Sequence, residues 1–138
     1  MAVRLTMLIV DDDRDDQDIL REVIEEINPS IRCHYAFNGL EALQCLANCA
    51  VMPDLIFLDL NMPVMSGREF LEAKKAQHSI ADIPVYVFTT SYSCLERNSV
   101  LRLGATDFLT KPTKYKMLSD VVSKILAKFN PPVKTFKV

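Results

Sequence analysis

The sequence lacks a long apolar run, an N-terminal signal segment and any marked excess of one charge sign. Because 16 basic side chains nearly balance 18 acidic ones, a nucleic-acid-binding surface is not expected, since such a surface needs clustered lysine and arginine. No apolar run approaches the roughly 18 residues that a membrane-spanning helix needs. The first residues also lack the apolar core of a secretory signal, so the sequence predicts a cytoplasmic protein.

The four cysteines, Cys33, Cys45, Cys49 and Cys94, form no C-x-x-C pair. Cys45 and Cys49 have a spacing that zinc accepts, but the other two cysteines and both histidines are scattered along the chain. We therefore expect reduced, mostly buried thiols rather than a disulfide framework or a zinc site.

The length of 138 residues and an apolar fraction of 49% fit one globular domain. A chain of this size buries enough surface to fold without a metal or a disulfide. Residues 1–130 are predicted to form that domain, and residues 131–138, which follow an Asn-Pro-Pro sequence, to form a short C-terminal tail.

Short apolar runs alternate with helical patterns along the whole chain. Strands are predicted at residues 5–10, 31–36, 55–58, 84–88 and 106–110. Helices are predicted around residues 19–27, 39–48, 66–77, 93–103 and 117–129. Ser66 with Glu69, and Ser93 with Glu96, form capping-box patterns at two helix starts, and Gly104 ends the second of these helices.

Strict alternation of five strands and five helices predicts right-handed crossovers and a parallel sheet with helices on both faces. The first, third and fourth strands are nearly continuous apolar runs, as expected for strands that are covered on both sides. The fold class is therefore α/β, with a doubly wound five-stranded parallel sheet.

Polar residues follow four of the five predicted strands. Asp11 and Asp12 follow the first, Asp59 the third, Thr89 ends the fourth and Lys111 follows the fifth. Because ligands of doubly wound sheets bind beyond the carboxyl ends of the strands, we expect these side chains to form one site.

Converging carboxylates repel one another unless a cation joins them, and Mg²⁺ prefers such oxygen ligands. A hydroxyl and a lysine beside the ion suit a phosphoryl group, and a carboxylate there can accept it as an aspartyl phosphate. Two plainer interpretations remain for the acidic run. Asp15, Asp16 and Asp18 fit a solvated helix start. A calcium loop from Asp11 to Glu22 is the other, although Asp16 occupies the position that needs glycine.

The sequence resembles the receiver domains of two-component response regulators, in particular the stand-alone regulators related to chemotaxis proteins. The resemblance covers nearly the whole chain and is carried by Val10-Asp11-Asp12, residues 54–63 with Gly67, Phe88-Thr89-Thr90, Gly104-Ala105 and Lys111-Pro112. It implies a flavodoxin-like fold with strand order 2-1-3-4-5.

The resemblance also implies roles for individual residues. Asp59 would accept a phosphoryl group from a sensor histidine kinase in a Mg²⁺-dependent reaction, with Thr89 and Lys111 contacting that group. The ion would be bound directly by Asp12, Asp59 and the backbone carbonyl of Asn61, with Asp11 acting largely through water. Lys111-Pro112 would be cis, and Phe108 would be a switch aromatic that moves from an exposed to a buried position.

The implied protein is an interaction module that catalyses only its own phosphorylation and dephosphorylation. Its signal would pass to a protein partner or to a second copy through the face of the fourth helix, fifth strand and fifth helix. A phosphorelay carrier shares the same site and stays an alternative. A phosphatase is a second alternative, but it would need a proton donor at the position of Asn61. A flavin carrier is a third, but the acidic run would repel the phosphate of a flavin.

Overall fold

The computed structural model describes residues 5–90 and 93–129, so the predicted tail at 131–138 lies outside the described residues. Five strands and five helices alternate in it, with bounds within two residues of those predicted, except that the first helix begins five residues earlier. The strands are β1 (Thr6–Val10), β2 (Arg32–Ala36), β3 (Leu55–Leu58), β4 (Val85–Thr89) and β5 (Asp107–Thr110). The helices are α1 (Arg14–Ile27), α2 (Gly39–Asn48), α3 (Gly67–Lys75), α4 (Cys94–Arg102) and α5 (Tyr115–Ala127).

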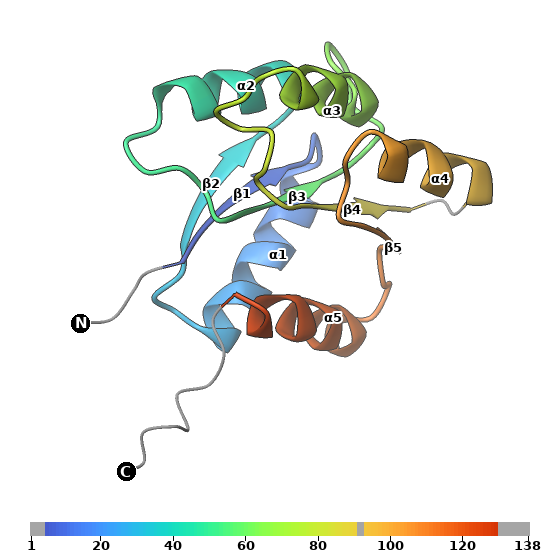
Figure 1. Cartoon of the computed structure of the whole chain (residues 1–138). Helices are drawn as coiled ribbons and strands as arrows, with labels where there is room; N and C mark the ends of the chain where they lie inside the picture. The colour runs from blue at the N-terminus through green and yellow to red at the C-terminus, as the bar shows by residue number, and fades with distance from the viewer. Residues whose placement is uncertain (1–4, 91–92, 130–138) are drawn as a thin grey trace.

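All strand pairs are parallel and the strand order is β2-β1-β3-β4-β5, which confirms the predicted doubly wound fold. Helices α1 and α5 cover one face of the sheet, and α2, α3 and α4 cover the other (Figure 1). None of the described helices is long and apolar enough to cross a membrane.

Side-chain alternation along the strands feeds two separate hydrophobic cores. In β1, Leu8 and Val10 join the core under α2, α3 and α4, whereas Met7 and Ile9 join the core under α1 and α5. Both faces are buried, which explains why β1 and β3 read as continuous apolar runs. The rigid central strands thereby fix the positions of the residues that follow them.

The helix starts agree with the capping predictions, with one exception. Ser66 and Glu69 form the complete capping box of α3. At α4, the Ser93 hydroxyl accepts from the Glu96 amide at 3.3 Å, but the Glu96 carboxylate pairs with Arg68 of α3 at 3.0 Å. The second box is therefore only half formed, because an ion pair between helices takes its carboxylate.

The four cysteines are not mostly buried, which differs from the prediction. Cys94 is exposed at the start of α4, and Cys33, Cys45 and Cys49 are half-buried. The sequence could not place Cys94, since α4 buries only Val100 and its apolar face is hard to recognise.

Candidate functional site

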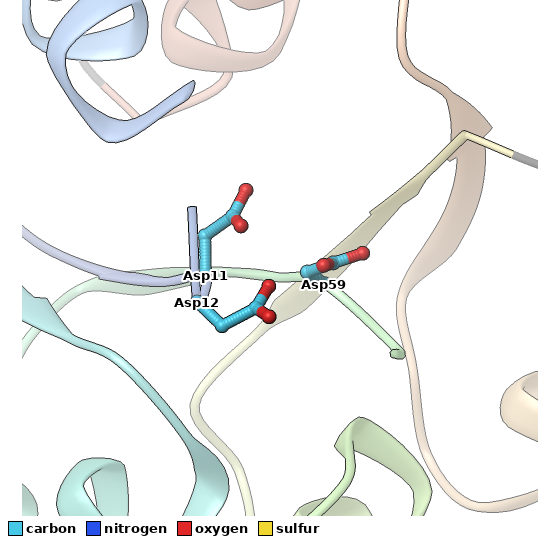
Figure 2. A group of neighbouring side chains, drawn as sticks. All are labelled: Asp11, Asp12 and Asp59. Carbon is cyan, nitrogen blue, oxygen red and sulfur yellow. The ribbon is translucent and has the colours of Figure 1, made fainter. Parts of the chain in front are cut away.

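The carboxyl ends of β1 and β3 bring three aspartates together. The register pairs Val10 with Leu58, and the Asp59 amide donates to the Val10 carbonyl at 2.9 Å. As a result, one carboxylate oxygen of each of Asp11, Asp12 and Asp59 lies within 4.8 Å of the others (Figure 2). Asp11 and Asp59 are buried, whereas Asp12 is exposed. The predicted acidic cluster is therefore present, at the predicted edge of the sheet.

The end of β1 is held in place by hydrogen bonds from α1. The side-chain amide of Gln17 donates to the carbonyls of Asp11 and Ala36, at 2.9 and 3.0 Å. The Asp13 amide donates to the Asp11 carboxylate at 3.0 Å, and the Asp13 side chain caps α1. Sequence analysis missed Gln17, although it lies three residues before Leu20 and so on the buried face of the helix.

The chain turns tightly after Asp59. The Leu60 amide donates to the Asp59 carboxylate at 2.9 Å, and the Gly67 amide donates to the Leu60 carbonyl at 2.9 Å. A Cβ atom on Gly67 would lie 2.5 Å from the Asp59 carbonyl oxygen. Glycine is therefore required where α3 begins against the strand end. The exposed Asn61 lies in this loop, and its carbonyl stays a predicted ligand.

Lys111 reaches the acidic cluster from the end of β5. Its ammonium nitrogen lies 2.7 Å from Asp11 Oδ2 and 2.9 Å from Asp16 Oδ2. Its amide donates to the carbonyl of Thr89, which is fully buried at the end of β4. Thr89 and Lys111 thus lie at the edge where the sequence placed them.

Asp16 differs from its prediction as a solvated residue. It is half-buried in the first turn of α1 and forms an ion pair with Lys111. The calcium-loop interpretation is also wrong, because the chain is helical from Arg14 onward and the Asp13 side chain caps that helix.

Two expectations about neighbouring residues are corrected. The Lys111-Pro112 peptide is trans, which is the isomer that X-Pro bonds favour by about 0.5–1 kcal/mol. Phe108 is already buried, with 4% of its surface exposed, in the core that α4 helps to cover. Its ring has no hydroxyl that would favour a solvent-exposed position, so burial of the whole ring is favourable.

Burial and charge repulsion perturb the titration of this site. Burial raises the pKa of Asp59 from 3.8 to about 6, and the charges of Asp11 and Asp12 add to the rise while Lys111 opposes it. Burial also raises the pKa of Asp11, against its hydrogen bond to Lys111. For Lys111, burial would lower the pKa, but the hydrogen bonds to Asp11 and Asp16 outweigh it and raise the pKa.

The site fits a hard divalent cation. Four carboxylates face the single ammonium of Lys111, and they belong to Asp11, Asp12, Asp16 and Asp59. Negative charge is therefore left unbalanced beside the buried carboxyl group of Asp59. The three clustered aspartates offer only oxygen ligands, which Mg²⁺ prefers, and one of them is open to solvent for bound waters. The donor set therefore suits Mg²⁺ rather than a softer metal.

The chain belongs to the response regulator receiver domain family, whose model matches residues 7–123. Domains of this family are the receivers of two-component systems, and they are in general not enzymes. The family assignment agrees with the fold and the acidic cluster described above.

Among curated proteins, three relatives illustrate how the family is used. The chain is 30% identical over 118 residues to the sensor histidine kinase CheAY of Helicobacter pylori, covering 86% of this chain and 14% of that protein. It is 34% identical over 122 residues to the cyclic di-GMP phosphodiesterase response regulator RpfG of Xanthomonas campestris pv. campestris, covering 88% and 32%. It is 34% identical over 131 residues to response regulator MprA of Mycobacterium sp. (strain KMS), covering 95% and 54%. The chain thus spans about half or less of each relative's length.

Solved structures of similar length match nearly end to end. The phosphorylated cyanobacterial phytochrome response regulator RcpA is 28% identical, with a TM-score of 0.83 and coverage of 91% of this chain and 93% of that one. The Mn(2+)-bound form of response regulator Rcp1 is 29% identical, with a TM-score of 0.81 and coverage of 92% and 95%. Chemotaxis response regulator CheY4 of Vibrio cholerae is 27% identical, with a TM-score of 0.76 and coverage of 89% and 99%.

Proposed function

We propose that this chain is a cytoplasmic, phospho-accepting response regulator that receives a phosphoryl group from a sensor histidine kinase on Asp59. The observation that carries the proposal is the buried Asp59 carboxyl group between two further aspartates, with Lys111 on the same cluster. Residues 1–130 would form the receiver, followed by a tail at 131–138. The RcpA and Rcp1 structures, which match 91% and 92% of this chain, support the assignment as a response regulator.

Transfer would begin when an Asp59 carboxylate oxygen attacks the phosphorus atom of a phosphohistidine. The P–O bond to Asp59 forms, the P–N bond breaks, and the released imidazole keeps the electron pair and takes a proton from water. The carboxylate must be ionised to attack, so neighbours that favour its charged form promote the reaction.

Asp11, Asp12 and Asp59, with the carbonyl of Asn61, would hold Mg²⁺ in this proposal. When bound, the ion offsets the negative charge of the phosphoryl oxygens and of the aspartates. Lys111 would pair with a phosphoryl oxygen, and the Thr89 hydroxyl would donate to another. No external substrate is turned over, since the phosphoryl group remains on the protein until water removes it.

The proposal is tested by incubating the chain with acetyl phosphate and Mg²⁺ and measuring the intact mass. We expect one adduct of about 80 Da, which corresponds to a single phosphoryl group. The adduct should be absent when the metal is chelated. Transfer from a purified, autophosphorylated histidine kinase should give the same adduct, and an unmodified mass under both conditions would refute the function.

The signal should leave through the face formed by α4, β5 and α5, which would bind a partner protein or a second copy. Because Phe108 is already buried, its inward movement is not available as the signal. The coupling instead begins at Thr89, which ends β4 directly before the segment leading to α4, a helix with Val100 as its one buried residue. A phosphoryl group that draws Thr89 toward Asp59 would therefore displace the start of α4.

Beryllofluoride with Mg²⁺ should mimic the phosphoryl group and shift NMR resonances across α4 and β5. Thr89→Ala keeps the three aspartates, so it should still bind the mimic but lose most of these distant shifts. Because Thr89 is fully buried, Thr89→Val serves as a second variant, which replaces the hydroxyl with a methyl group and so leaves no cavity. Distant shifts that persist in both variants would contradict a coupling through the hydroxyl.

A further inference from the structure

Lys111 is held by two carboxylates that belong to different parts of the site. Its ammonium lies 2.7 Å from Asp11 at the end of β1 and 2.9 Å from Asp16 in the first turn of α1. Among the described residues, no ion pair joins Lys111 to Asp59. Two of the three ammonium donors are therefore used on residues other than the proposed phosphoryl acceptor.

The Asp16 side of this arrangement is fixed by the start of α1. The Asp16 amide donates to the Asp13 carboxylate at 3.2 Å, which caps the helix. The next residue, Gln17, ties the helix to the ends of β1 and β2 by its two hydrogen bonds. Asp16 therefore cannot follow Lys111 toward Asp59, and Lys111 must stretch from Asp16 or leave it.

The ion pair is also weak enough to open. The Lys111 side chain is 16% exposed and that of Asp16 is 37% exposed, compared with 3% for Asp11. Lys111 and Asp16 both line a hollow of about 430 Å³ beside α1 and α5, which brings solvent to the pair. Solvent screening reduces the strength of such a pair, so a stronger competitor for the ammonium can displace Asp16.

We propose that Asp16 is a positioning residue that latches Lys111 in the unphosphorylated state and competes with the phosphoryl group for it. This inference rests on the proposed function. Phosphorylation adds a charge of about −1.5 to −2 at Asp59, which attracts the ammonium. With a cation on Asp11, that residue's hold on Lys111 weakens, and Asp16 is then the remaining competitor. The Asp16–Lys111 ion pair thereby lowers the affinity of the site for a phosphoryl group.

The latch is tested with Asp16→Asn, which removes the charge and keeps the shape. Asp15→Asn is the matched control, since Asp15 lies in the same helical turn, is exposed and removes the same charge at a neighbouring position. In beryllofluoride titrations at constant Mg²⁺, Asp16→Asn should tighten binding by about three- to tenfold relative to Asp15→Asn. Asp16→Glu, which keeps the carboxylate, should bind the mimic more nearly as the wild type does.

Two further measurements show whether Asp16 acts through Lys111. In a Lys111→Met background, the difference between Asp16→Asn and Asp15→Asn should vanish. In the metal-free chain without any mimic, NMR relaxation of the Lys111 side chain should show increased mobility in Asp16→Asn only. Equal affinities and unchanged Lys111 mobility would overturn the latch. If the wild type binds no mimic although Lys111 mobility responds to Asp16→Asn, Asp16 still holds Lys111, but the competition with a phosphoryl group and the proposed function both fail.

Discussion

Asp59→Asn should abolish phosphorylation by acetyl phosphate, and the adduct of about 80 Da should disappear. An amide is a poor nucleophile toward phosphorus, and Asp11, the other buried carboxylate of the cluster, is already paired with Lys111 at 2.7 Å. Asparagine keeps the shape of the side chain, and its Oδ1 can still accept from the Leu60 amide. The variant should therefore fold normally, so that loss of the adduct reports chemistry rather than stability.

Asp15→Asn is the matched control for this experiment, because it removes one negative charge from the exposed start of α1. It should be phosphorylated at nearly the wild-type rate. Intact-mass measurements over a time course would distinguish a slow reaction from none. The same adduct on Asp59→Asn would show that another residue is the acceptor.

Mg²⁺ should stabilise the chain strongly at pH 7.5 and weakly at pH 5. Folding raises the Asp59 pKa from 3.8 to about 6, so the unfolded chain ionises this carboxyl group more readily than the folded chain. As the pH rises from about 4 to about 6, the metal-free folded chain loses stability, and above that range the loss is complete. It amounts to about 3 kcal/mol for Asp59. Burial raises the pKa of Asp11 as well, which acts in the same direction.

Thermal unfolding with and without Mg²⁺ at the two pH values tests this expectation. Asp59→Asn removes the ionisation, so the metal-free variant should be more stable than the wild type at pH 7.5. It should also gain little from Mg²⁺. A metal-free wild type whose stability rises between pH 4 and pH 6.5, and more steeply than that of Asp59→Asn, would contradict the raised pKa.

Calorimetric titration should show that Asp12→Ala weakens Mg²⁺ binding by more than about tenfold. Even residues that only support a metal ligand change affinity by roughly 10- to 100-fold when removed. Asp12 is exposed, so its loss should leave the fold intact. An unchanged affinity in Asp12→Ala would place the ion elsewhere on the chain.

The fold was predictable because periodicity and strand ends are local properties of the sequence. The four apolar residues of β3 are bounded on both sides by aspartate, and the predicted strand at 55–58 agrees with the observed one. The acidic cluster was predictable for a related reason, since parallel strands must bring their carboxyl ends to one edge.

What the sequence did not reveal depends on how helices are rotated and packed. Asp15 and Asp16 are identical neighbours in the chain, yet only Asp16 is turned toward Lys111, 95 residues away. Likewise, the Glu96 carboxylate does not complete the predicted capping box, because it pairs with Arg68 of α3. The burial of Phe108 depends on the core beneath α4, whose own apolar pattern is weak. Each of these contacts joins segments that are distant in sequence, which no local pattern reports.

The shallow anchoring of α4 has a consequence for how the molecule fluctuates. Val100 is the only buried residue of this helix, whereas α1 and α5 each bury four. Opening α4 alone exposes little apolar surface, so its amides should exchange with deuterium well before those of the central strands. The free-energy cost of displacing this helix on binding another protein should therefore be small. The fold thus combines a rigid sheet with one locally labile helix.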